Sequence, residues 1–99
     1  MKLLTKALLK KLPKLYETDE QSIDETMLYV KLFTPWSNWT WYIAEYDPED
    51  RRAFGLVEGF EKEWGYFCMD ELESISGVGG LKIERDKYFT PKLAKDLKD

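Results

Sequence analysis

Hydrophobic and polar positions follow a helical period at the start of the chain. After Thr5, leucines recur at positions 8, 9 and 12, while lysines occupy positions 6, 10 and 11. This spacing predicts an amphipathic helix that Thr5 caps. The helix should end near Leu12, because Pro13 disfavours helical geometry in the residue before it. Residues 17–26 are mostly acidic or polar, which predicts a solvated loop.

Four later stretches have the two-residue period of β-strands: residues 27–33, 39–46, 53–60 and 64–69. In the second of them, alternation places two sets of side chains on opposite faces, with Trp39, Trp41 and Ile43 on one and Tyr42, Ala44 and Tyr46 on the other. Short turn-forming links separate the stretches. Consecutive strands with short links most simply form an antiparallel meander.

The last third of the chain predicts short elements. Asp70 is typical of a helix N-cap, with Glu73 as its capping-box partner, and predicts a helix over residues 71–75. Residues 81–84 indicate a short strand or extended segment. Thr90 followed by Pro91 favours a final helix through Leu97.

These elements predict an α+β fold in which residues 1–99 form a single domain. We expect a small antiparallel β-meander of about four strands, with the N-terminal helix and short C-terminal helices packed mainly on one face, because the apolar stripe of the first helix must be buried against another element. The predicted core residues are Leu8, Leu12, Leu28, Val30, Leu32, Ile43, Leu56, Val57, Phe67, Leu72 and Ile75.

Residue counts restrict the chemistry. The chain has no histidine and one cysteine, Cys68. Ser-His or Cys-His nucleophile pairs and a tetrahedral zinc site are therefore excluded. The acidic loops lack the spacing of calcium ligands, and "GVGG" lacks the spacing and the lysine of a phosphate loop. We expect no catalytic residue, no cofactor and no metal, so the protein is predicted not to be an enzyme, with Cys68 a small core residue.

Glu45 and Glu58 are the residues on which a hydrolase would have to depend. Glycoside hydrolysis needs two carboxylates that flank the scissile bond. Both glutamates fall inside predicted strands, where a carboxylate faces either a pocket or the solvent side of the sheet. The pattern is equally consistent with both positions.

The N-terminal segment resembles a signal peptide only superficially. Its lysines interrupt any apolar stretch, and no apolar run approaches the roughly 18 residues of a membrane span. A single cysteine fits a reducing compartment. We therefore expect a cytoplasmic protein.

Charge is distributed unevenly along the chain. Residues 1–14 carry five lysines and no acid, whereas residues 15–75 carry 15 acidic and 4 basic side chains. Residues 76–99 carry six basic and four acidic side chains. An acidic middle segment argues against broad binding to phosphate backbones, which requires clustered lysine and arginine.

Several stretches together resemble one family. They are "MKLLTKALLKKLPKLYET", "VKLFTPWSNWTWYIAEYDPED", "FGLVEGFEKEWGYFCMDELESI" and "IERDKYFTPKLA". They are similar to the bacterial family known as domain of unknown function 2958, over nearly the whole chain. The longer acidic loop between Tyr16 and Met27 departs from the family pattern. The resemblance implies a small bacterial protein that is often encoded on plasmids, phages or integrated elements, and it supplies no activity, cofactor or site.

The aromatic stretch around residue 40 has three interpretations. The rings are core side chains, or they form a protein-contact surface, or Trp39 and Trp41 stack the bases of single-stranded nucleic acid beside Arg51 and Arg52. Neighbouring acids repel phosphate, which disfavours the last. The predicted partner-binding residues are Trp36, Trp39, Tyr46, Asp47, Glu49, Asp50, Arg51 and Arg52.

The acidic clusters, 17–25, 45–50 and 70–73, are either a solvated face or a surface that mimics DNA phosphate. Our leading hypothesis is a small acidic, non-enzymatic binding protein of a phage or mobile element that acts by protein–protein contact. Its partner would be a host defence nuclease or DNA-processing enzyme with a basic groove. The alternative is a module that binds single-stranded nucleic acid through aromatic side chains of the sheet.

Overall fold

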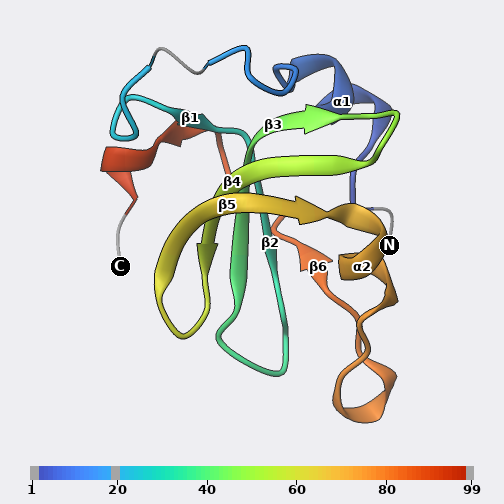
Figure 1. Cartoon of the computed structure of the whole chain (residues 1–99). Helices are drawn as coiled ribbons and strands as arrows, with labels where there is room; N and C mark the ends of the chain where they lie inside the picture. Colours follow the sequence, from blue (N-terminus) through green and yellow to red (C-terminus); the bar gives the residue numbers. More distant parts are fainter. Residues whose placement is uncertain (1–2, 19–20, 98–99) are drawn as a thin grey trace.

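The chain folds around a five-stranded antiparallel sheet (Figure 1). The structure is a computed structural model that describes residues 3–18 and 21–97. The strand order is β5-β4-β3-β2-β6. The strands span Val30–Phe33 (β2), Thr40–Asp47 (β3), Arg52–Glu58 (β4), Lys62–Cys68 (β5) and Glu84–Arg85 (β6). The first four form the predicted meander, and β6 adds a fifth strand beside β2.

The strand β5 begins earlier in the sequence than predicted. We expected residues 61–63 to be a link, but Lys62 and Glu63 belong to β5, and β4 and β5 pair without a break from Arg52 opposite Cys68 to Glu58 opposite Lys62. The turn is therefore confined to residues 59–61, where the amide of Gly59 donates to the carbonyl of Glu61 (3.0 Å). The short turn extends the ladder and gives β5 its full length.

The predicted strand over 27–33 is divided between two sheets. β1 (Met27–Leu28) pairs with β7 (Lys92–Leu93), while β2 joins the main sheet. The predicted final helix is wrong, because residues 92–94 bond to residues 26–28 and only a 3₁₀ turn follows, at Ala94–Asp96. A helix this short gains too little from its own hydrogen bonds to compete with strand pairing.

Two short helices lie beside the sheet. α1 spans Lys6–Lys11, and the Thr5 hydroxyl accepts from the amide of Leu8 (3.3 Å), which confirms the predicted cap. α2 spans Met69–Ser74 and begins two residues earlier than predicted, with Cys68 at its N-cap. A third turn, of 3₁₀ type, spans Val78–Gly80. Among the described residues, no helix has the length and apolarity needed to cross a membrane.

The capping box predicted for α2 is absent. Asp70 lies in the first turn of the helix, and no side chain caps its amino end. The carboxylates of Asp70 and Glu73 both contact the guanidinium of Arg51 instead. Asp70 and Glu73 therefore bind Arg51, which is remote in the sequence, and do not cap the backbone of their own helix.

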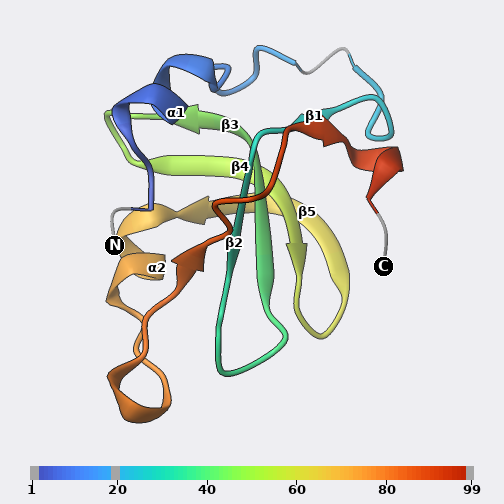
Figure 2. The same cartoon turned by 180° about the vertical axis from the view of Figure 1, so that it is seen from behind.

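Side chains are buried on both faces of the sheet. Figures 1 and 2 show the fold from opposite sides, and in Figure 2 the segment from β6 to β7 passes in front of β2. One face packs against Leu3, Leu4, Leu8 and Leu12 of the N-terminal segment, together with Met69 and Leu72 of α2. The other packs against Phe89, Ala94 and Leu97 of the C-terminal segment. Both helices therefore share one face, as expected, whereas the C-terminal segment covers the opposite face.

A bulge changes the alternation in β3. The register with β4 shifts between Ile43 and Glu45, so Glu45 lies opposite Phe54 and Tyr46 lies opposite Ala53. As a result Tyr46 belongs to the same buried cluster as Trp41 and Ile43, whereas simple alternation predicts the opposite face. An extra residue in one strand turns all later side chains over.

Most predicted core residues are buried or pack against the core. Ile75 is the exception, because it follows α2 and is exposed. Strand and helix periods did not identify the buried residues Leu3, Leu4, Trp41, Tyr42, Ala44, Tyr46, Ala53, Met69 and Ile83. Trp41, Tyr42, Ala44 and Tyr46 belong to β3, which is buried on both faces, so alternation does not separate buried from exposed positions there.

Candidate protein-interaction surface

The predicted partner-binding residues are divided between the two ends of β3. Trp36 and Trp39 lie in the connection from β2 to β3, whereas Asp47 to Arg52 form the turn from β3 to β4. A strand of eight residues separates them. The structure therefore brings together the turn residues, but it does not place the two tryptophans around that turn.

The two tryptophans pack on glycines. A β-carbon at Gly77 would lie 2.1 Å from the Trp36 ring, and one at Gly59 would lie 2.3 Å from the Trp39 ring. The Trp39 ring also stacks with Trp41 at 5.9 Å between ring centres. Both tryptophans are partly buried. One ring face of each packs against other residues of this protein and is not available to a ligand.

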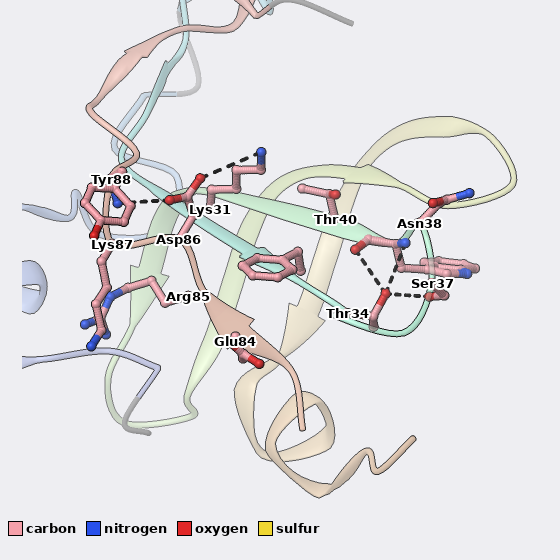
Figure 3. Close-up of a pocket in the computed structure, with 12 residues that line it drawn as sticks. Lys31, Thr34, Ser37, Asn38, Thr40, Glu84, Arg85, Asp86, Lys87 and Tyr88 are labelled. Carbon is pink, nitrogen blue, oxygen red and sulfur yellow. Dashed lines mark hydrogen bonds and ion pairs between the residues drawn. The ribbon is translucent and has the colours of Figure 1, made fainter. Parts of the chain in front are cut away.

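A cleft of about 700 Å³ lies beside Trp39, between the β2–β3 connection and residues 84–88 (Figure 3). Figure 3 shows Lys31, Asp86 and Tyr88 on one side of this cleft and Thr34, Ser37 and Asn38 on the other. Its polar groups bond largely to one another: Lys31 pairs with Asp86 (3.9 Å), and Thr34 contacts Ser37. Acids and bases are mixed in the lining, so the cleft favours neither sign of ligand charge.

Arg51 ties the β3–β4 turn to α2. Its guanidinium contacts Asp70 and Glu73, with 2.9 Å to Glu73, and its carbonyl accepts from the amide of Met69 (2.8 Å). Hydrogen bonds to Glu73 and to the buried Tyr46 raise the pKa of Arg51 above its ordinary value. Arg51 and Tyr46 are therefore occupied in holding this end of the sheet together.

This link brings two acidic segments together. Residues 47–50 and residues 70–73 are separated in the sequence, and both lie where the β3–β4 turn meets the start of α2 (Figure 1). We call this region the acidic end, and it comprises Asp47, Glu49, Asp50, Asp70, Glu71 and Glu73. All of these side chains are exposed or partly exposed.

Exposed aromatic side chains adjoin the acidic end on the sheet face that carries Phe54. Tyr16 is 56 % exposed and Tyr66 is 50 % exposed, with 6.2 Å between their ring centres. Arg52 lies over the Tyr66 ring at 5.8 Å, and Phe54 stacks on Trp64 at 5.8 Å. We call this set the tyrosine face. Alternation along β5 predicts that Trp64 and Tyr66 lie on the same face of the sheet. No pattern in the sequence predicts that Tyr16 lies beside them.

Glu45 holds the loop that carries Tyr16. The carboxylate is only 2 % exposed, and it accepts from the amides of Tyr16 (2.8 Å) and Thr18 (2.9 Å) and from the Thr18 hydroxyl. Tyr16 itself has a left-handed backbone, with φ of 70°. The solvent-face interpretation of Glu45 is therefore wrong, because its position after the bulge points it at this loop.

A pocket of about 420 Å³ lies between the Tyr16 loop and the β3–β4 turn. It contains four of the predicted partner-binding residues, and its lining residues are Lys14, Leu15, Tyr16, Tyr46, Asp47, Pro48, Glu49 and Arg52. Rings, two acids and two bases thus converge on one concave site. This is the part of the predicted surface that the fold assembles.

The two glutamates of the hydrolase hypothesis both contact other groups of the protein. Glu45 is fully engaged by the loop, and Glu58 pairs with Lys62 (3.4 Å) at the end of β4. Cys68, at the end of β5, is a free thiol and is partly exposed. Within residues 3–18 and 21–97, no group of three acidic or cysteine side chains is arranged to hold a metal ion.

Comparison with known proteins identifies the family. The family described as "Protein of unknown function (DUF2958)" matches residues 3–95. No curated protein and no solved structure matches the chain. Because the match covers nearly the whole sequence, this chain belongs to the DUF2958 family.

Proposed function

We propose that this chain is a non-enzymatic binding protein that uses its acidic end and tyrosine face to occupy a basic surface of another protein. The observation that carries the proposal is the link made by Arg51, which gathers two acidic segments at one end of the sheet. Acids from both segments produce a potential that complements a groove rich in lysine and arginine. Such complementarity speeds encounter and fixes orientation.

The tyrosine face would supply most of the affinity. Tyrosine, tryptophan and arginine are the side chains that most often dominate binding energy at protein interfaces. Tyr16 and Tyr66 are half exposed and stand beside Arg52, so they can bury further area against a partner. The exposed acids would then act mainly through steering, since charges at the rim of an interface contribute little affinity.

A groove that normally binds DNA phosphates is the partner surface that best fits this arrangement. Within the proposal, the target is a host defence nuclease or a DNA-processing enzyme, and the chain is a cytoplasmic accessory protein of a phage or mobile element that inhibits it. The setting implied by the family resemblance supports this choice. The acidic end would stand in for the phosphates.

Binding of single-stranded nucleic acid has less support. A base-stacking platform needs open ring faces with cations beside them. Trp41 is buried, and Trp39 is enclosed by Gly59, Trp41 and Phe60. Tyr66 is the better placed ring, but Asp47 and Glu49 lie in the same pocket as its neighbour Arg52.

Affinity capture from a bacterial host lysate tests the proposal. The wild type is compared with a variant that combines Asp47→Asn, Glu49→Gln and Asp50→Asn. A control of equal net charge combines Asp24→Asn, Glu25→Gln and Asp96→Asn, which surround Lys95 near the paired strands β1 and β7. Added double-stranded DNA serves as competitor.

We expect the wild type and the control to retain a DNA-binding protein that DNA displaces. The acidic-end variant should retain at least about tenfold less of it, since loss of several complementary charges weakens association strongly at low salt. Equal retention by all three proteins would overturn the proposed surface. Retention that DNA does not affect would overturn the proposed class of partner.

A further inference from the structure

β5 is the long open edge of the main sheet. It is seven residues long and pairs only with β4 among the described strands, whereas the other edge, β6, has two residues. Its pairing with β4 is regular, and neither a bulge nor a proline interrupts it. Natural proteins usually shorten, bend or charge such an edge to prevent pairing with other chains. Here only the first two residues of β5 are charged.

The backbone groups that point away from β4 can be assigned. The amide of Met69 donates to the carbonyl of Arg51 (2.8 Å), and the register continues unbroken along β5. Because hydrogen bonds alternate along an antiparallel pair, every second residue back from Met69 bonds to β4. The amides of Trp64 and Cys68 therefore point outward, toward the side where a further strand would pair.

Charge decides which strand would fit. Glu61 and Glu63 lie at one end of β5, and Lys62 between them is paired with Glu58 (3.4 Å). Asp70 and Glu71 follow the other end, where Asp70 is paired with Arg51 and Glu71 is exposed. A second copy, added antiparallel, would place acids against acids at both ends. An extended segment with basic residues at its ends would meet opposite charge at both.

We propose that β5 binds an extended basic segment of the partner protein by strand addition. The main chain of that segment would pair with the outward backbone groups of β5, and alternate side chains would lie beside Trp64 and Tyr66 on the tyrosine face. Strand addition derives affinity from main-chain hydrogen bonds and specificity from alternate side chains. This inference rests on the proposed function, because it specifies how a basic partner is held next to the acidic end.

The test uses the full chain and a synthetic peptide of about nine residues, with lysines at both ends and alternating valine and threonine between them. A second peptide has the same sequence with N-methylated valines, which keeps its charge and removes backbone donors. Amide exchange and chemical shifts are followed by NMR. Two variants form a matched pair: Cys68→Pro removes one outward amide, and Cys68→Ala keeps it.

We expect the plain peptide to slow exchange at the amides of Trp64 and Cys68. N-methylation, and separately Cys68→Pro, should each weaken binding about tenfold, while Cys68→Ala binds like the wild type. The N-methylated peptide on the wild-type protein keeps the test valid even if the proline variant fails to fold.

Equal binding of both peptides would overturn strand addition and leave contact through charge, the proposed function, supported. Absence of binding by either peptide would also overturn strand addition, while lysate capture still decides the proposed function independently. Protection of the same amides that depends on protein concentration without peptide would overturn the proposed occupant in favour of a second copy.

Discussion

Trp39 lies over Gly59 so closely that a β-carbon at residue 59 would come within 2.3 Å of the indole ring. The ring cannot move aside freely, because Trp41 stacks on it and Phe60 contacts it edge-on at 5.4 Å between ring centres. Gly59 belongs to the β4–β5 turn, and Trp39 to the β2–β3 connection. The contact therefore locks two neighbouring hairpins together at their tips.

Gly59→Ala should destabilise the protein by about 1–3 kcal/mol, because the added methyl group must displace a ring that is held by other rings. Gly65→Ala is the matched control. A β-carbon at Gly65 would meet no atom within 4 Å, so its stability should change by less than about 0.5 kcal/mol. Urea unfolding followed by circular dichroism measures both, and equal midpoints for the two variants would contradict this packing.

Glu45→Gln should lower the free energy of unfolding by about 2 kcal/mol, because an amide cannot accept all the hydrogen bonds that the carboxylate accepts from the Tyr16 loop. Glu58→Gln removes a partly exposed ion pair with Lys62 and should cost less than about 1 kcal/mol. Chemical denaturation compares the two. Amide exchange should also accelerate at Tyr16 and Thr18 in Glu45→Gln alone, and unchanged exchange there would contradict the role assigned to Glu45.

Arg51→Ala should loosen α2 more than it lowers global stability. The ion pairs to Asp70 and Glu73 are partly exposed, so their loss is worth about 1 kcal/mol. Amide exchange within α2 should rise, whereas Arg52→Ala, which removes the neighbouring arginine, should leave α2 unaffected. Similar amide-exchange rates of α2 in both variants would contradict the role of Arg51 as the link between the turn and α2.

A second substitution at the same position separates backbone strain from ionic contact. Arg51 has a left-handed backbone, with φ of 54°. Glycine adopts this conformation more readily than alanine, so Arg51→Gly should be more stable than Arg51→Ala by about 1 kcal/mol. Thermal unfolding gives the comparison, and an alanine variant at least as stable as the glycine variant would show that this conformation is not retained.

Single-stranded DNA of mixed sequence should not quench tryptophan fluorescence at micromolar protein concentration. The rings of Trp39 and Trp41 stack on each other, and Trp39 also packs on Gly59, so these ring faces are not available to bases. Quenching that strengthens at low salt would favour nucleic-acid binding instead. Comparison of Trp39→Phe with Trp64→Phe would then assign the signal either to the hairpin tips or to the tyrosine face.

The sequence predicted the parts of this fold that depend on local periodicity. The helix capped by Thr5 and the central meander follow from spacing and short links. Alternation failed at Tyr46, because a bulge has no signature in the residues that form it. The Thr90–Pro91 signal failed because a distant strand competes for the same backbone groups.

The candidate surface was predictable only where its residues are neighbours in the chain. The turn itself was predicted, and its residues Asp47, Pro48, Glu49 and Arg52 line one pocket. Its joining to Asp70 and Glu73 depends on one arginine that reaches across the fold, and the position of Tyr16 depends on a buried carboxylate. Contacts between remote residues leave no trace in periodicity or composition.

The pairing of β1 with β7 also orders the steps by which the chain folds. The hairpins from β2 to β5 join residues close in the sequence, so they can close quickly, whereas β1 and β7 must find each other across most of the chain. Closing so long a loop is slower, and the contacts between β1 and β7 stabilise the chain only after the meander has formed. In pulse-labelled refolding, the amide of Ala94, which bonds to Thr26, should therefore gain protection after the amides of β4.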